Sequence, residues 1–250
     1  MACQQDSKLD KYLLVCEGPT DTYVIKRLAS KIYEDLGKPV EIIALAPQID
    51  ATTGTWERHG WGGVRNWCKK YGVKTPQDIA AVHPNLRPLL ARQSWQALMA
   101  IRGAKGLIIQ IDSDIAEQIK DIPAFNPAVK HRRDYCEEAL HHWLKEKPSK
   151  DIVHFAITSF AIETWLLATL DPANIAFASL TAPYNLEDLS DWEARLIAAG
   201  FKAHNKDGAI RLQKSPSERY EAYGEQIANS SVIVRQKCAS AESLCSFLEL

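Results

Sequence analysis

The sequence predicts an α/β protein whose mainly parallel sheet is flanked by helices. Residues 11–17 (KYLLVCE) and 106–114 (GLIIQIDSD) are apolar runs closed by carboxylates, as expected of buried parallel strands that end at a site. A helical pattern separates the first run from another apolar run at residues 39–46 (PVEIIALA). This strand, helix, strand order strongly favours parallel pairing.

The elements follow in order from these runs. After a turn at Gly18, residues 21–37 (DTYVIKRLASKIYEDLG) carry apolar side chains at helical spacing and stop at a glycine. Residues 47–105 interrupt this alternation of strands and helices and are predicted to be an insertion with its own helices. The later elements are expected as a helix at 131–146, a strand at 151–158 and helices at 159–170, 185–199 and 216–228. The predicted domains are 1–170 for the sheet domain and 171–250 for a helical C-terminal extension.

Composition limits the function classes. With 250 residues and 46% hydrophobic content, the chain can bury a substantial core. No apolar stretch approaches the roughly 20 residues that span a bilayer, and the polar start lacks the apolar centre of a signal peptide, so we expect a cytoplasmic protein without a membrane partner. The six cysteines show no zinc spacing. The net charge of -1 argues against holding nucleic acid by overall charge, so a polyanion must bind locally or through metal.

Carboxylates gather at the predicted strand ends. Glu17, Asp112 and Asp114 each fall at or just past such an end, where sites form in open parallel sheets. Their repulsion needs a cation, and oxygen ligands without histidine or cysteine favour Mg²⁺ or Mn²⁺, as one or two ions. Asp21 can add a ligand for a second ion, or it can simply stabilise the helix dipole.

Two small residues would support these acids. Gly18 lets the backbone turn sharply beside Glu17, although an ordinary turn glycine explains it nearly as well. Ser113 separates Asp112 from Asp114, whose side chains can converge once the strand ends and the backbone turns.

The pairing of YLLVCEGPTD (12–21) with GLIIQIDSD resembles the TOPRIM fold. This Rossmann-type metal-binding module is shared by topoisomerases, primases and nucleases, including the overcoming-lysogenisation-defect group. The family carries a glutamate after its first strand, usually followed by glycine, and a DxD motif after a later strand. The resemblance covers roughly residues 11–170, with the insertion as an unusual feature. It implies Glu17, Asp112 and Asp114 as the acidic triad, and Asp21 as the second acid of the nuclease branch.

Glu163 lies in SFAIETWLLATL. In the nuclease branch, acids after a fourth strand assist the second metal, and the IETWLLA string also looks like small TOPRIM-like bacterial proteins. The alternative is a glutamate that uses the dipole at a helix start. No capping box explains it, because neither Ser nor Thr stands at position 160, and we favour the metal role.

Basic residues would act on the phosphate. Lys214 is the preferred cation for stabilising the transition state. Other cations can neutralise the phosphate backbone, although a solvated mixed-charge surface is the better explanation for most of them individually. In the first part of the chain they are Arg58, Arg65, Lys69, Lys70, Arg132 and Arg133, and near the C-terminus they include Lys202, Lys206 and Arg211.

These patterns predict a divalent-metal-dependent nuclease that hydrolyses phosphodiester bonds of DNA or RNA. A DxD-type nucleotide-sugar transferase is one alternative, but it leaves Glu17 and Gly18 unexplained. The other alternative is a regulatory or nucleic-acid-binding module that acts only with a partner. The chain has no GxxxxGK[ST] motif, and the resemblance implies that a separate ATPase subunit can drive such proteins, with a role in antiviral defence by analogy. The sequence leaves open the oligomeric state and the choice between internal and terminal cutting.

Overall fold

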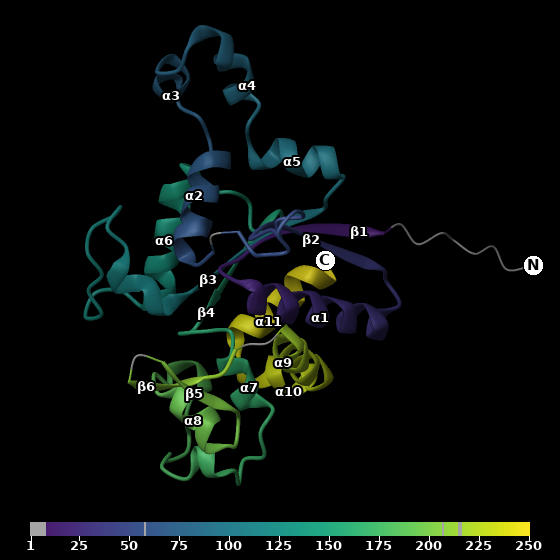
Figure 1. The fold of residues 1–250 in the computed structure, drawn as a ribbon, viewed down its shortest axis with the longest axis vertical. Helices are drawn as coiled ribbons and strands as arrows, with labels where there is room; N and C mark the ends of the chain where they lie inside the picture. The colour runs from purple at the N-terminus through teal and green to yellow at the C-terminus, as the bar shows by residue number, and fades with distance from the viewer. Residues whose placement is uncertain (1–8, 58, 207, 215–216) are drawn as a thin grey trace, which may run out of the picture. The chain divides into compact units, whose positions relative to one another are not determined.

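The computed structural model describes residues 9–57, 59–206, 208–214 and 217–250 (Figure 1). Its main sheet has the order β2-β1-β3-β4. The central β1 (Asp10–Val15) pairs in parallel with β2 (Val40–Ala46) and with β3 (Gly106–Asp112), and β4 (Val153–Thr158) lies beyond β3. The predicted α/β class with a parallel sheet and helices is therefore confirmed.

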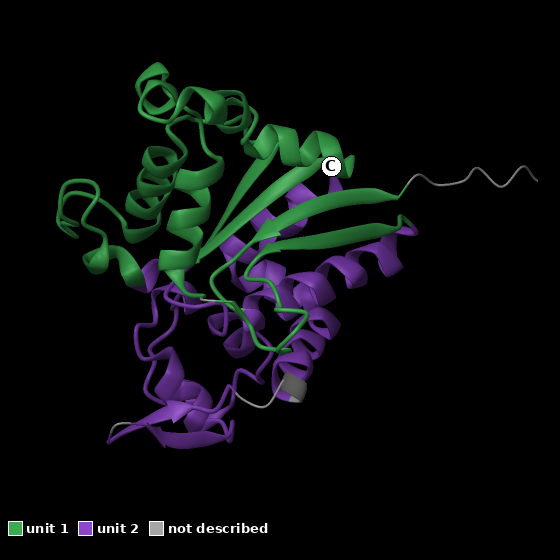
Figure 2. Ribbon diagram, turned by 45° about the horizontal axis from the view of Figure 1, so that its top comes forward, with its two compact units in different colours: residues 1–18, 38–111, 115–157 green, residues 19–37, 112–114, 158–250 purple. Residues whose placement is uncertain are grey.

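Contacts group the chain into two compact units, coloured separately in Figure 2. The first unit comprises residues 1–18, 38–111 and 115–157, and the second comprises 19–37, 112–114 and 158–250. Asp112 and Thr158, the last residues of β3 and β4, are grouped with the second unit. The domain boundary at residue 170 stays a prediction.

The first unit contains most of the sheet and a group of helices, some of which pack on one of its faces. These helices are α2 (Trp61–Tyr71), α3 (Pro76–Ala80), α4 (Arg87–Ala91), α5 (Trp95–Arg102) and α6 (Arg132–Leu144), with a 3-10 helix at Pro84–Leu86. Leu13 and Val15 of β1 share one core with Trp67 of α2 and Trp143 of α6. The alternate residue Leu14 points to the other face and is also buried. Burial of both faces explains why the strand reads as a continuous apolar run.

The second unit is mainly helical. It contains α1 (Pro19–Leu36), α7 (Thr164–Ala168), α8 (Trp192–Ala198), α9 (Ser217–Asn229), α10 (Ser231–Lys237) and α11 (Ala239–Glu249), with 3-10 helices at Ile175–Phe177 and Leu186–Asp188. A further 3-10 helix, Ser113–Gln118, follows β3. α1 packs along α9 and also contacts α11, where the Tyr33 hydroxyl donates to the Leu248 carbonyl at 2.9 Å.

Most predicted elements are confirmed, and three expectations need correction. The helix expected at 159–170 is only five residues long, because the chain first turns at Phe160, whose φ is 60°. The helix expected at 185–199 is a 3-10 turn followed by the shorter α8. The C-terminal part, expected to be helical, also contains an antiparallel hairpin of β5 (Ala203–Lys206) and β6 (Ala209–Leu212). The sequence pattern did not reveal this hairpin, because its strands are only four residues long and mostly exposed.

No helix in the described part of the chain is long and apolar enough to cross a membrane.

The close packing of α2 on α6 gives a stability prediction. A Cβ at Gly72 would lie 2.5 Å from the Leu144 carbonyl oxygen and 2.7 Å from that of Cys68. Because both neighbours are backbone atoms, Gly72→Ala should destabilise the protein by about 1–3 kcal/mol through overpacking. Urea unfolding followed by circular dichroism measures this difference.

Gly62→Ala is the matched control. Gly62 lies within α2 and a Cβ there would meet nothing within 4 Å, so alanine should be neutral or stabilising by up to about 1 kcal/mol. Equal unfolding free energies for the two variants would contradict the predicted close contact.

Candidate functional site

The ends of β3 and β4 are tied together by two hydrogen bonds. The Thr158 hydroxyl donates to Asp112 Oδ1 at 2.5 Å. The Phe160 amide donates to the Ser113 hydroxyl oxygen at 3.1 Å. Thr158 and Ser113 are almost fully buried, so these bonds are shielded from competing water. Together they fix the direction in which the Asp112 carboxylate points.

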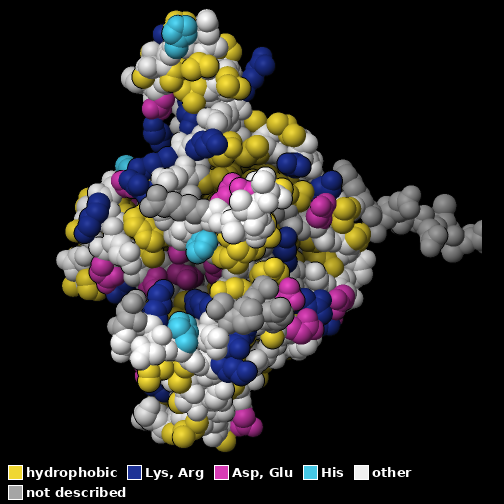
Figure 3. Space-filling view, in the orientation of Figure 1, with side chains coloured by type: hydrophobic (Ala, Val, Ile, Leu, Met, Phe, Trp, Pro, Cys, Tyr) yellow, Lys and Arg dark blue, Asp and Glu magenta, His cyan; other side chains and the backbone are white. Residues whose placement is uncertain are grey.

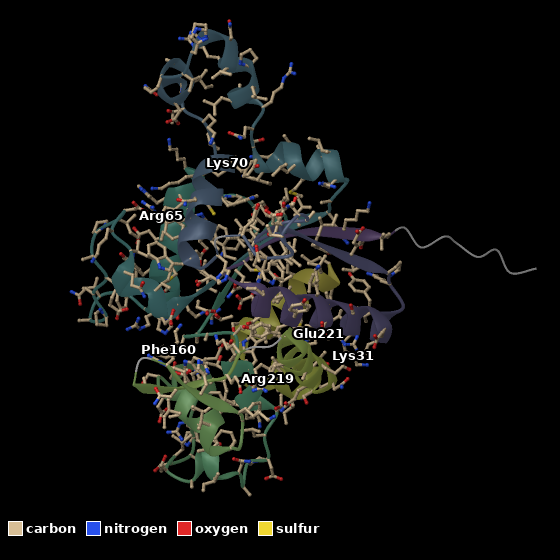
Figure 4. All side chains as sticks on the ribbon, viewed as in Figure 1. Lys31, Arg65, Lys70, Phe160, Arg219 and Glu221 are labelled. Atoms are coloured by element: carbon tan, nitrogen blue, oxygen red, sulfur yellow. The ribbon has the colours of Figure 1, made fainter. Side chains whose placement is uncertain are left out.

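The turn after β4 is held in an unusual conformation. Phe160, labelled in Figure 4, has a φ of 60°, a left-handed conformation that costs a non-glycine residue about 1–2 kcal/mol. Such outliers persist where the surrounding structure enforces them, often at functional sites. Here the turn leads directly to Glu163, at the start of α7.

Glu163 is a buried carboxylate paired with one lysine. It is 2% exposed, and its Oε1 lies 2.5 Å from Lys214 Nζ. Glu163 stands at the N-cap position of α7 but makes no capping hydrogen bond. Neither of its oxygens has a further hydrogen-bond donor among the described residues. Because a buried charge is costly unless it is compensated, the Lys214 ammonium is what stabilises Glu163 as an anion.

Three acids act on this ammonium. The Lys214 side chain is 40% exposed. Its partial removal from water would lower the pKa of Lys214, but the charge of Glu163, followed by those of Asp112 and Asp21, outweighs this effect and raises the pKa well above its usual value. Asp21 lies in the first turn of α1 and is 6% exposed. Acids from three distant segments, α1, the end of β3 and the start of α7, are thus brought to one cation.

Asp114 and Glu17 are placed differently. Asp114 lies on the 3-10 helix after β3 and is exposed. Glu17 belongs to the first unit, where its amide donates to Gln110 Oε1 at 3.1 Å and its carbonyl accepts from the Gly60 amide at 2.6 Å. Gly18 follows it and accepts a weak bond from the Cys16 thiol, Sγ to O 3.4 Å.

Gln110 is a buried hydrogen-bond partner of Glu17 that the sequence analysis missed. It is fully buried within β3, where a polar side chain needs a partner. Its carbonyl oxygen finds one in the Glu17 amide. A single glutamine inside the apolar run GLIIQID is the signal that could have identified it.

The predicted phosphate-binding cations of the first unit mostly contact acids. Arg65 of α2 donates to both carboxylate oxygens of Asp121, and Lys69 lies 3.3 Å from the same group. The Arg65 guanidinium holds the pKa of Asp121 well below its usual range. Arg132 pairs with Glu117. Arg133 is half-buried, and Arg58 lies outside the described residues.

A hollow of about 730 Å³ opens in the first unit beside residue 16. The start of α2 forms one side, with Trp61 and Arg65, and the exposed Lys70 lies further along the same helix (Figure 4). The Lys70 ammonium lies 5.1 Å from the centre of the Tyr71 ring. Aromatic and cationic side chains therefore line the same hollow.

The acids fit a hard divalent ion by their chemistry. Their donors are carboxylate oxygens without histidine or cysteine, which suits Mg²⁺ or Mn²⁺. In the described residues, no group of three or more His, Cys, Asp or Glu side chains is arranged to hold a metal ion. The positive charge among Glu163, Asp112 and Asp21 is supplied by Lys214.

Comparison with models of protein families, with curated proteins and with solved structures found no match. The resemblance to the TOPRIM fold therefore stays a prediction from the motifs.

The ion pair gives an asymmetric stability prediction. Lys214→Met leaves Glu163 buried without its counter-charge, which should cost about 3 kcal/mol. Glu163→Gln should cost less, about 1 kcal/mol, because the Lys214 side chain is 40% exposed and can remain hydrated. Urea unfolding of both single variants and of the double variant measures the coupling.

Lys206→Met is the control, since this lysine is exposed on β5 and its loss should change stability by less than about 0.5 kcal/mol. The buried ion pair would be refuted by a Lys214→Met variant as stable as this control.

Proposed function

We propose that this chain is a divalent-metal-dependent phosphodiesterase that hydrolyses nucleic acid. The supporting observation is the convergence of Asp21, Asp112 and Glu163 on the single ammonium of Lys214. It lies where β3 and β4 end, the edge at which α/β sheets place their sites. Two of these acids, Asp21 and Glu163, are buried, and buried acids beside a further carboxylate are costly to folding, which favours a functional reason for them.

Asp112, Asp21 and Glu163 would hold the metal ion, and the proposal adds Asp114 of the same unit to them. The expected role of Glu17, which belongs to the first unit, is left to the cleavage test. Glu17 follows β1, the strand that pairs with β3. A bound pair of ions would supply a water of lowered pKa and stabilisation of the leaving oxygen. These are the requirements of an in-line attack on a phosphodiester.

The chain's own residues would prepare this chemistry. Thr158 orients the Asp112 carboxylate through its hydroxyl hydrogen bond, which limits the directions from which a ligand can approach. Gln110 fixes the backbone at Glu17. Lys214 would contribute a positive charge to a phosphate oxygen, because a lysine ammonium is charged at neutral pH.

Metal binding can be tested without any partner subunit. Mn²⁺ titrated calorimetrically into the full chain should bind at least about tenfold more weakly to Asp112→Asn and to Glu163→Gln, a loss of about 1.4 kcal/mol. Lys214→Met should bind Mn²⁺ more tightly than wild type, because the ammonium competes with the ion for Glu163. Glu221→Gln is the matched control, since Glu221 is exposed on α9 of the same unit (Figure 4). Equal affinities in all variants would refute the site.

Cleavage tests the function itself. Plasmid, single-stranded DNA and transfer RNA are incubated with the chain and Mg²⁺ or Mn²⁺, and products are resolved on gels. Asp112→Asn, Glu163→Gln and Glu17→Gln should each slow cutting by about a hundredfold or more, the scale of losing one group that stabilises transition-state charge.

Glu221→Gln should cut at the wild-type rate. Cutting that survives in the three site variants would show that the acids do not carry the reaction. Metal binding without cutting of any substrate would refute autonomous hydrolysis and favour a chain that acts only with a partner such as a separate ATPase subunit.

A further inference from the structure

The β5–β6 hairpin of the second unit displays cations on one face. In its antiparallel register His204 lies opposite Arg211, and Lys206 lies opposite Ala209. Since alternate residues of a strand point to the same face, His204 and Lys206 of β5 share a face with Arg211 of β6. All three are exposed.

This face lines a groove of about 540 Å³, here called the hairpin groove. Its lining also includes Lys214, Tyr220 and Glu193. Three permanent cations thus face one carboxylate in a chain whose net charge is only -1. In the space-filling view, Lys, Arg and His side chains show over the region of the hairpin (Figure 3).

Fold stability does not explain these cations well. Lys206 and Arg211 are diagonal neighbours across the two strands, near enough for long charged side chains to repel each other. Arg211 pairs with Glu193 at 2.9 Å, but Lys206 has no carboxylate within salt-bridge distance in the described ranges. A ligand with several negative charges would offset the repulsion, and a sugar–phosphate backbone provides them at regular spacing.

An aromatic ring is fixed in the same groove. Tyr220 of α9 lines it, and its ring stacks on Tyr23 of α1, with 6.5 Å between ring centres and 16° between planes. A ring held in this way can offer its edge or free face to a nucleobase without a further loss of side-chain freedom. Aromatic rings beside a basic groove are the usual elements of binding to single strands.

The groove reaches the acids through one residue. Lys214 lines the groove and also pairs with Glu163, so a phosphate bound beside Lys214 would lie next to the acid cluster. The groove volume is in the range of pockets for one small-molecule ligand, about 300–1,000 Å³. It would therefore hold one or two nucleotides of a strand and would exclude a duplex.

We propose that the hairpin groove binds the backbone of single-stranded nucleic acid without sequence preference. Lys206 and Arg211 contact phosphates, Tyr220 contacts a base, and the strand continues to Lys214. The proposal deepens the phosphodiesterase function and rests on it for the role of the bound strand, whereas binding itself needs neither metal nor cutting.

The test is fluorescence anisotropy with labelled twelve-nucleotide oligo-dT, oligo-U and a DNA duplex, in EDTA so that no metal-dependent cutting occurs. Lys206→Gln/Arg211→Gln should weaken binding to single strands at least about tenfold. It should also reduce the slope of log affinity against log salt by about 1.4, the value for losing two phosphate contacts on a single strand. Tyr220→Leu should weaken binding with an unchanged salt slope, since stacking releases no counterions.

Arg92→Gln/Arg102→Gln is the matched control, because it removes the same charge from two exposed arginines of the first unit. It should bind like wild type. Thermal melts establish that all variants fold. Tighter binding of oligo-dT or of oligo-U would identify DNA or RNA as the ligand.

The groove proposal is overturned by three results: equal weakening in the control pair, no effect of the hairpin pair, or duplex binding as tight as that of single strands. No binding of any strand by wild type overturns it as well. If single strands bind through Lys206 and Arg211 but no substrate is cut, the phosphodiesterase proposal is overturned and the groove remains a binding site. Cutting that needs the acids but not Lys206 and Arg211 would support the phosphodiesterase and overturn the role of the hairpin groove in holding its substrate.

Discussion

The need to compensate buried negative charge governs this candidate site. Glu163 is 2% exposed, and removing a carboxylate from water costs several kcal/mol unless a counter-charge lies close by. Lys214 provides that charge, with Nζ 2.5 Å from Glu163 Oε1. The same ammonium also interacts electrostatically with Asp112 and Asp21. The burial of the Glu163 carboxylate therefore depends on this one cation. A divalent ion would meet the same requirement with a higher charge, which connects the structural role of the site to its proposed chemistry.

The short hydrogen-bonded link between β3 and β4 gives the acids their geometry. Strand ends are free to splay where ladder bonds stop, yet here side chains continue the connection, with Thr158 bonded to Asp112 and Ser113 bonded to the Phe160 amide. The left-handed turn at Phe160 then directs the chain into α7 and buries Glu163. Backbone strain is thus located beside the acids, where preorganisation is useful to binding or catalysis.

Charge pairing also separates the basic residues into two groups. Arg65, Lys69 and Arg132 contact Asp121 or Glu117 within the first unit, so a phosphate would have to compete with carboxylates for them. The face of the β5–β6 hairpin differs, because its cations outnumber its one acid. The net charge of the whole chain does not show this local excess of positive charge. The excess makes the hairpin groove the better candidate site for binding a polyanion.

The sequence by itself determined the strands and the acids at their ends. Apolar runs such as LLV and GLII specify buried strands, because both faces of a parallel sheet are covered and exclude water. The carboxylates that end these runs mark the edge of the sheet. The tertiary structure decided which charges meet. The pairing of Glu163 with Lys214, the bond from Glu17 to Gln110 and the neutralisation of Arg65 by Asp121 join segments far apart in the chain. Periodicity reports only neighbours within one element, whereas these contacts follow from how elements pack.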